Sequence, residues 1–434
     1  MQDEGALSRR PALWLYITAG ALIAVAILVT VAWIGPLPPR VVVMSTGTAG
    51  GTYEVFAERY KAILARSGVV LRLVPSAGGV ENLARLNDPH SDVMVAFVQS
   101  GLTSKEESPD LESLGTLFYE PFWFFSSDAA LGARLEGLRG KKVSIGPEGS
   151  GTRALAAQFL AFNGIDQNNA QLLPLTAAQS GDALLRGEID AAAMVASWDT
   201  PVVRRLLDSS GIHLWEVPRT DALIALHPFL SKLVLPEGVA NMVTDRPPTD
   251  INVVAPKASL VVRRDLHPAI QYLLLGAASE IHAAPGIFQK SGQFPALEEE
   301  DLPLSKEANR YYKSGDPFLQ RYLPFWLAVV AGRVLVLLIP VIGVAYPLLR
   351  ATPALYGWSM RRRIFQLYGE LKSIEIDFET KGNRTTDDML ARLNRLEGRA
   401  DHLRVPRAFA TLLYTLRLHI GMVRTRFKES SRSA

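Results

Sequence analysis

The fold of this 434-residue chain is indicated most clearly by one stretch near its start, residues 41–53, which reads VVVMSTGTAGGTY. Val41 to Met44 form a short apolar run that predicts a buried strand, and Gly47 to Thr52 form a polar, glycine-rich turn. The residues from Tyr53 to Ser67 then follow a helical pattern. This order is typical of a parallel sheet, in which ligands bind beyond the carboxyl ends of the strands.

The same pattern recurs immediately downstream. A second strand, Val69 to Val74, ends at the turn Pro75-Ser-Ala-Gly-Gly-Val80, and another helix starts at Glu81. Val93 to Val98 form a third apolar strand. Because the carboxyl ends of parallel strands share one edge of the sheet, the glycine-rich turns are expected to lie together.

A second group of the same kind begins near residue 141, and an extended stretch, Leu117 to Ser126, joins the two groups. We therefore expect an α/β fold with two lobes and a cleft between them, lobe 1 at about 40–120 and 225–290 and lobe 2 at about 126–220. The second group comprises a strand at 141–145, a turn at 146–153, a helix at 154–163, a strand at 171–175, a helix at 178–186 and a strand at 191–195.

Three of the turns start helices and have the composition of an anion site. They read Gly50-Gly-Thr-Tyr53, Ser76-Ala-Gly-Gly79 and Ser150-Gly-Thr152. A helix start offers unpaired backbone N–H groups and the positive end of its dipole, and glycine lets the backbone approach a ligand. We expect Gly51, Gly79, Gly151 and Arg153 to contribute, Arg153 through a bidentate carboxylate contact. The alternative is that these are ordinary tight turns with helix caps.

Several classes of chemistry have no support in the sequence. The chain has no cysteine, so disulfides, thiol catalysis and cysteine-ligated metals are excluded. The run from Gly146 to Arg153 lacks the Gly-Lys-Ser/Thr ending of a phosphate loop, and no G-x-S-x-G motif or metal-ligand histidine spacing is present. We therefore predict a binding protein that is not an enzyme and uses no metal or cofactor.

Two apolar segments predict membrane spans. Residues 11–34 carry no charge and have tryptophan or tyrosine near both ends, and residues 324–349 are apolar except for Arg333. The alternatives are a cleaved signal peptide for the first segment and a buried core helix for the second. Basic residues flank both segments on their outer sides, so residues 1–10 and 350–434 are predicted to be cytoplasmic and 40–322 periplasmic.

The net charge of +3 averages two compartments. Residues 40–323 have a net charge of −6, whereas residues 350–434 have a net charge of +8. The basic tail has apolar residues at helical spacing and predicts helices at about 358–380, 386–400 and 406–427, with breaks at Gly382-Asn383 and Val405-Pro406. It is expected to lie near the inner leaflet or to dock on a partner protein, and no nucleic-acid binding is predicted.

Seven short segments give the external region a resemblance to a known family. It resembles the solute receptors of TRAP transporters of the TAXI type, which are two-lobed periplasmic binding proteins with a type II Venus-flytrap fold. The matching segments read Gly47-Thr-Ala-Gly-Gly-Thr-Tyr53, Ser76-Ala-Gly-Gly-Val-Glu-Asn-Leu83, Asp92-Val-Met-Val-Ala-Phe-Val-Gln-Ser100, Leu117-Phe-Tyr-Glu-Pro121, Leu138-Arg-Gly-Lys-Lys-Val143, Gly149-Ser-Gly-Thr152 and Leu185-Arg-Gly-Glu-Ile-Asp-Ala191.

The resemblance implies capture of a small organic anion, such as glutamate or a dicarboxylate, for separate TRAP-type permease subunits in the bacterial inner membrane. The membrane anchors place the chain with a membrane-bound subset of the family. A transmembrane sensor that signals through the helical tail is the alternative. By position, the cleft-lining residues would be Thr52, Tyr53, Ser76, Asn82, Gln99, Ser150, Thr152 and Trp198.

Overall fold

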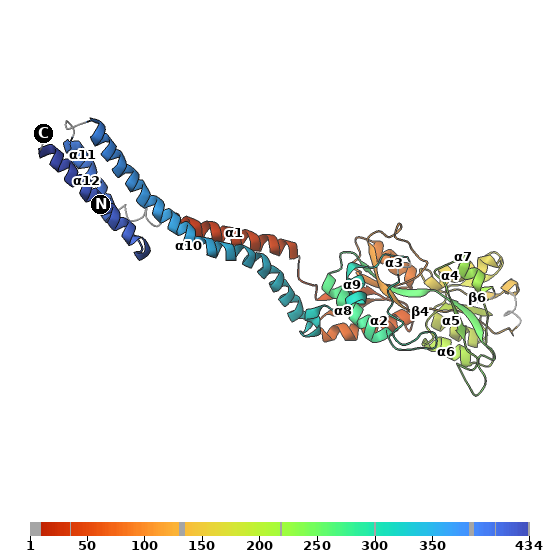
Figure 1. The fold of residues 1–434 in the computed structure, drawn as a ribbon. Coiled ribbons are helices and arrows are strands. Elements are labelled where there is room, and N and C mark those ends of the chain that lie inside the picture. The colour runs from red at the N-terminus through yellow and green to blue at the C-terminus, as the bar shows by residue number, and fades with distance from the viewer. Residues whose placement is uncertain are drawn as a thin grey trace. The chain divides into compact units, whose positions relative to one another are not determined.

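The computed structural model describes residues 10–34, 36–129, 135–217, 219–298, 301–381, 386–403 and 405–432. The chain divides into two compact units, Pro36–Ala331 and a second made of Met1–Gly35 with Gly332–Ala434 (Figure 1). The first unit holds all the strands of the described residues, and it contains two lobes, each built on a five-stranded sheet.

The first lobe is built on a mixed sheet with the strand order β2-β1-β3-β12-β4. β1 pairs in parallel with β2 and β3, whereas β12 pairs antiparallel with both β3 and β4. The last strand therefore inserts between two strands that are consecutive in the sequence. The elements are β1 (Val41–Ser45), α2 (Thr52–Arg66), β2 (Val70–Val74), α3 (Gly79–Asn87), β3 (Val95–Gln99), β4 (Leu111–Tyr119), β12 (Lys257–Arg263), α8 (Pro268–His282), α9 (Lys306–Ser314) and η3 (Phe318–Arg321).

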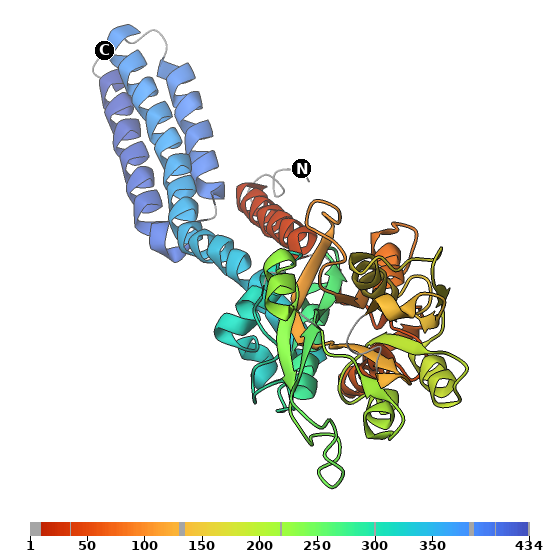
Figure 2. The same cartoon turned by 90° about the vertical axis from the view of Figure 1, so that its right-hand side faces the viewer.

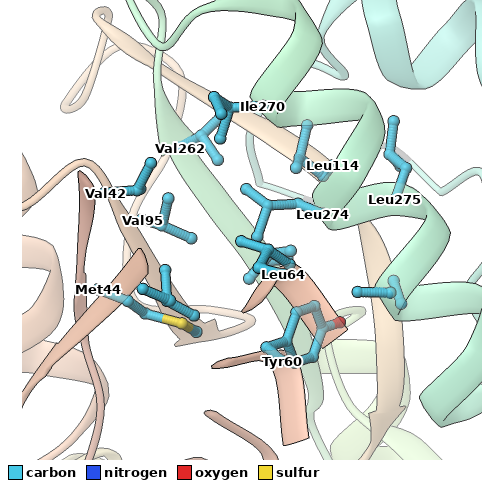
Figure 3. Close-up of a cluster of buried hydrophobic side chains, with 14 of the residues drawn as sticks. Val42, Met44, Tyr60, Leu64, Val95, Leu114, Val262, Ile270, Leu274 and Leu275 are labelled. Atoms are coloured by element: carbon cyan, nitrogen blue, oxygen red, sulfur yellow. The ribbon is translucent and has the colours of Figure 1, made fainter. Parts of the chain in front are cut away.

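The core of the first lobe lies where α2 and α8 cover one face of this sheet. Met44 and Val262 project from the strands toward Leu64 of α2 and Leu274 of α8, and each of these side chains is at most 1% exposed (Figure 3). Full burial of such a side chain stabilises a fold by about 1.5–3 kcal/mol. This packing fixes the position of the first turn of α2, which follows directly from β1.

The second lobe has the strand order β7-β6-β8-β5-β9. β6 pairs in parallel with β7 and β8, and β5 is antiparallel to β8. The strand and helix pattern predicted from the sequence is therefore confirmed in both sheets. The elements are β5 (Phe122–Ser126), η2 (Leu135–Leu138), β6 (Lys142–Ser144), α4 (Gly151–Phe162), β7 (Gln171–Leu173), α5 (Ala177–Leu185), β8 (Ala191–Val195), α6 (Pro201–Asp208), β9 (His213–Leu214) and α7 (Thr220–Leu226).

The return of the chain to the first lobe differs from the sequence-based boundary near residue 225. β10 (Ser231–Leu235) and β11 (Ile251–Ala255) form an antiparallel pair whose buried side chains belong to the cores of the second lobe. The chain re-enters the first sheet only at Lys257, the start of β12. The apolar face of the hairpin needs a partner, and β5 provides it.

The two lobes are joined by two neighbouring crossings of the chain. One runs from β4 through Glu120 to β5, and the other runs from β11 through Pro256 to β12. The backbone N–H of Glu120 donates to the carbonyl of Pro256 at 2.9 Å, so the crossings are hydrogen-bonded to each other. Glu120 thus lies at the hinge between the lobes.

The second unit is helical. Its helices are α1 (Arg10–Ile34), α10 (Phe325–Lys381, whose first residues belong to the other unit), α11 (Thr386–His402) and α12 (Ala410–Arg432), with η5 (Arg407–Phe409) before α12. Ile364, Ile374, Leu396 and Leu416 are buried between α10, α11 and α12, which lie side by side in Figure 2. The predicted helical tail is therefore confirmed.

Membrane-spanning capacity differs between the two predicted spans. Within the described residues, α10 is the one helix with enough length and apolar composition to cross a bilayer, and the shorter apolar helix Gly20–Ala32 lies within α1. A span at 11–34 stays a prediction. α10 continues through Pro340, Pro347 and Pro353, so the separate helices expected at 324–349 and 358–380 are one. Residues 1–9 and the break at Gly382-Asn383 lie outside the described residues.

Candidate functional site

A small cavity lies between the two lobes. It has a volume of about 80 Å³, and the loops that follow β1, β2 and β6 all reach it, together with the last residue of β3. This is the edge at which the carboxyl ends of the parallel strands meet. The lining residues are Gly47, Thr48, Gly51, Thr52, Tyr53, Ala77, Gly78, Gly79, Gln99, Glu120, Gly146, Pro147, Ser150, Gly151, Thr152, Leu175, Ala177, Ala193, Met194, Val195, Ala196 and Thr200.

Three helices start at the wall of this cavity. α2 and α3 come from the first lobe and α4 from the second, and their first residues are Thr52, Gly79 and Gly151. The first turn of each helix has backbone N–H groups without intrahelical partners, and the helix dipole adds partial positive charge. The Ser150 hydroxyl caps α4 by accepting from the Arg153 N–H at 3.1 Å.

The backbone of α4 comes unusually close to the side chain of Gln99. A Cβ atom added at Gly151 would lie 2.1 Å from Oε1 of Gln99, so glycine is required for this approach. Gln99 is the last residue of β3 and is 3% exposed. Its amide has no hydrogen-bond partner within the part of the chain that the structure describes, and it lines the cavity. A polar ligand could therefore satisfy it.

Glu120 is the one side chain with a carboxyl or basic group among the lining residues. It is 3% exposed, and the Tyr53 O–H donates to its Oε2 at 2.8 Å. Burial raises the pKa of Glu120 to about 8, and the hydrogen bond from Tyr53 acts in the opposite direction. The pKa of Tyr53 is also raised, mainly by burial and then by the Glu120 charge. Glu120 is therefore largely protonated at neutral pH.

The lobes touch each other beside the cavity. Oγ1 of Thr52 lies 2.9 Å from Oγ1 of Thr200 and accepts from the Ser197 N–H at 3.2 Å. On the other side, the Glu81 N–H donates to the Gly149 carbonyl at 3.0 Å. These contacts join the first lobe to the second, so the structure has the lobes closed over the cavity.

The profile of one protein family covers this whole region. The NMT1-like family matches residues 44–314, which is more than half of the chain. The chain belongs to the NMT1-like family. The matched range contains nearly all of both lobes and every residue that lines the cavity.

Solved structures that resemble this NMT1-like protein share little sequence with it. A protein of Bordetella bronchiseptica RB50 is 18% identical, with 57% of this chain and 72% of that chain covered and a TM-score of 0.40. The periplasmic aliphatic sulphonate binding protein SsuA from Escherichia coli is 15% identical, with coverage of 73% and 83% and a TM-score of 0.35. The alkanesulfonate-binding protein SsuA from Xanthomonas axonopodis pv. citri is 17% identical, with coverage of 56% and 74% and a TM-score of 0.36.

Most of the site residues predicted from the sequence of this NMT1-like protein line the cavity. Ser76 and Asn82 instead lie under the turn between β2 and α3. Nδ2 of Asn82 donates to the carbonyls of Thr46 and Phe97 at 2.7 and 3.0 Å, and Oγ of Ser76 lies 2.7 Å from Oδ1 of Asn82. These two residues shape the turn. The eight predicted residues that line the cavity are Gly51, Thr52, Tyr53, Gly79, Gln99, Ser150, Gly151 and Thr152.

Arg153 and Trp198 are predicted site residues that the structure places away from the cavity lining. Successive helical residues are turned by about 100°, so Arg153 leaves the face that Gly151 and Thr152 present, and its guanidinium lies 3.8 Å from Glu148. Trp198 packs beside Trp123, with ring centroids 6.4 Å apart, and lines a separate cavity of about 290 Å³. No cationic side chain stands among the residues that line the candidate site.

Glu120 was not among the predicted site residues. A sequence signal existed, because a carboxylate stands between two strongly apolar strands in the segment Leu117-Phe-Tyr-Glu-Pro121. Within the described residues, no group of three or more histidine, aspartate or glutamate side chains could hold a metal ion.

Proposed function

We propose that this protein is a membrane-anchored periplasmic solute-binding subunit that captures a small organic anion, such as glutamate or a dicarboxylate. The observation that carries the proposal is the cavity between the lobes, where the first turns of α2, α3 and α4 meet. Each helix start stabilises a nearby negative charge by about 0.3–1 kcal/mol, and more in partly buried geometry. The site therefore holds an anion without a lysine or arginine side chain.

Closure of the lobes is the binding step. Thr52 from α2 meets Thr200 and Ser197 of the second lobe, and separation of the lobes at this point would break these contacts. A ligand that touches helix starts from both lobes favours the closed state, because it loses contacts when the lobes separate.

The resemblance to TAXI-type receptors supports a role beside separate TRAP-type permease subunits. α10 supplies a helix long and apolar enough to anchor the chain, and Arg350, Arg361, Arg362 and Arg363 follow its apolar part. We propose that the anchor lies in a bacterial inner membrane with the lobes in the periplasm and both termini in the cytoplasm. The uptake path itself is supplied by the permease.

The test is a thermal-shift screen of the intact chain in detergent micelles. Ligands that bind the native state raise its melting temperature, with about 2.7 kcal/mol of stabilisation at a hundredfold excess over Kd. We expect at least one small carboxylate-bearing compound to give a saturable rise. The absence of any shift across a broad panel of organic acids and amino acids would contradict the proposal.

A transmembrane sensor is the second candidate, and one observation favours it. α10 is a single 57-residue helix that continues past its apolar part into the helical tail. Deleting residues 351–434 distinguishes the two functions. Unchanged solute uptake without the tail supports the transport subunit, whereas a lost transcriptional or partner response with normal uptake supports the sensor.

A further inference from the structure

The lining of the cavity contains two chemically different kinds of group, and only one of them suits an anion. The helix starts at Thr52, Gly79 and Gly151 supply hydrogen-bond donors and partial positive charge. The opposite character comes from Glu120, whose carboxyl group lies at the hinge and lines the same space. A dianion would place one of its charges in the cavity with this acidic group.

Only one of the two carboxyl oxygens of Glu120 has a hydrogen-bond partner among the described residues. Oε2 accepts from Tyr53, whereas Oε1 has no hydrogen-bond partner among the described residues. The residue is only 3% exposed, so bulk water reaches it poorly. Because Glu120 lines the cavity, the contents of the cavity are the natural hydrogen-bond partner of Oε1.

We propose that Glu120 determines ligand specificity by pairing with a cationic nitrogen, so that the ligand is a zwitterion with a carboxylate at the helix starts and an ammonium group at Glu120. This inference rests on the proposed solute-binding function and narrows it, because it selects amine-bearing acids over acids without an amine. The helix starts and Glu120 line one small cavity, so a single small molecule can contact both kinds of group at the same time.

The protonation state of Glu120 makes the inference measurable. Burial raises the pKa of its carboxyl group to about 8, so this group is largely protonated at neutral pH before a ligand binds. Binding an ammonium favours the carboxylate and releases the proton, and the affinity then rises with pH by up to about tenfold per unit below pH 8. The affinity for a dicarboxylate should instead fall as the pH rises, because a dicarboxylate binds best while Glu120 is neutral.

Other titratable groups do not obscure this window. Tyr53 is the one other titratable side chain that lines the cavity, and its pKa is raised well above the ordinary tyrosine value, so it stays neutral. The lining contains no histidine, lysine or arginine whose charge could change between pH 6 and pH 8.

The experiment compares matched ligand pairs on the intact chain in detergent micelles by titration calorimetry at pH 6, 7 and 8. The pairs are L-glutamate with glutarate, L-aspartate with succinate, and L-alanine with propionate. We expect the amine-bearing member of at least one pair to bind at least tenfold more tightly, with affinity that rises with pH. Calorimetry in two buffers of different ionisation enthalpy should show a proton released on binding.

Substitutions assign the effect to Glu120. Glu120→Gln should bring the two members of a pair to within a few-fold of each other and flatten the pH dependence. Glu58→Gln removes an exposed carboxylate of α2. It should leave both the discrimination within each pair and the pH dependence of affinity unchanged. If Glu120→Gln does not fold, the pH dependence of affinity and the proton release measured on the unaltered chain still test whether the ligand carries an ammonium group.

Three results would overturn the inference. Tighter binding of the acid without an amine, with affinity that falls as pH rises, would leave the solute-binding function intact and reject the zwitterion. Unchanged discrimination in a folded Glu120→Gln variant would also reject it. Failure of every compound to bind at any pH would overturn both the inference and the proposed function.

Discussion

Gly151 shows how one residue sets the closeness of the two lobes at the site. A Cβ atom at this position would lie 2.1 Å from Oε1 and 3.0 Å from Cδ of Gln99. The obstructing atoms are the end of a flexible side chain, so we expect Gly151→Ala to fold with a loss of stability of about 1 kcal/mol or less. The displaced amide and widened cleft should lower ligand affinity at least tenfold in calorimetric titrations. Gly276→Ala, where no atom lies within 4 Å, is the matched control; equal affinity of both variants would contradict this role.

His282 is a residue whose buried ring predicts a pH effect on stability. Burial, and then the Arg59 charge, lowers the pKa of His282 to about 3, and its Nε2 has no partner in the described structure. In the unfolded chain the pKa of His282 has the ordinary value near 6.5. Between pH 6.5 and pH 3 the unfolded state therefore binds a proton that the folded state does not, and stability falls as the pH falls. His282→Gln removes the effect. We expect urea unfolding to show the variant gaining about 2 kcal/mol relative to the unaltered chain between pH 7 and pH 5. If the difference in unfolding free energy between the two proteins were the same at pH 7 and pH 5, the His282 ring would have to be exposed to solvent.

Glu120 also makes stability depend on pH, with the opposite sign, but the comparison of the two proteins still isolates His282. The folded-state pKa of Glu120, about 8, lies above the unfolded value, so its contribution to stability falls as pH rises through this window. Both proteins carry Glu120, and its contribution cancels in the difference.

Residues in local turns were predictable from the sequence, whereas residues at the hinge were not. Gly51, Gly79 and Gly151 were found because each belongs to a glycine-rich turn that starts a helix. Glu120 gains its importance from two crossings that meet in space, with Pro256 separated from it by more than a hundred residues. Arg153 has the positive charge that an anion site needs and belongs to the turn that starts α4. Its side chain lies on a different face of the helix from the cavity, which composition alone does not reveal.

At the scale of elements, the first turn of α2 lies both at the wall of the cavity and at the contact between the lobes. Oγ1 of Thr52 contacts both Thr200 and Ser197 across the cleft. Thr52→Val keeps the shape of the side chain but removes two hydrogen bonds, each with a net contribution of about 0.5–1.5 kcal/mol. We expect affinity to fall by roughly tenfold or more and the melting temperature of the ligand-free protein to change little. Thr244→Val, in an exposed loop, is the control. Tighter binding by Thr52→Val would mean that the contact opposes closure.

Elements that pair with near neighbours were predicted well, and elements that pair at long range were not. The parallel β-α-β groups around β1 and β6 follow from local periodicity and glycine-rich turns. β12 pairs with β3 and β4, which lie more than a hundred residues away, and β10 and β11 join the core of the second lobe. Only the tertiary contacts decide these partners, so the boundary near residue 225 was set too early.

At the scale of the whole molecule, the charge distribution predicts on which side of a membrane each part lies. Residues 40–323 have a net charge of −6 and residues 350–434 have a net charge of +8. Positive residues beside a span stay in the cytoplasm. The chain has no cysteine, so single cysteines report topology without background labelling. Ser127 of the second lobe and Ser373 of α10 are both exposed.

We expect a membrane-impermeant maleimide to label Ser127→Cys in intact cells with a permeabilised outer membrane, and Ser373→Cys only after lysis. The physical reason is the bilayer between the two sites: the apolar part of α10 lies between these positions and is long enough to cross it. The unaltered chain provides the unlabelled control, and labelling after lysis confirms that both cysteines are accessible. Equal labelling of the two variants in intact cells would put the tail on the same side as the binding lobes. It would remove the route by which lobe closure could reach a cytoplasmic partner, while leaving solute capture by the lobes unaffected.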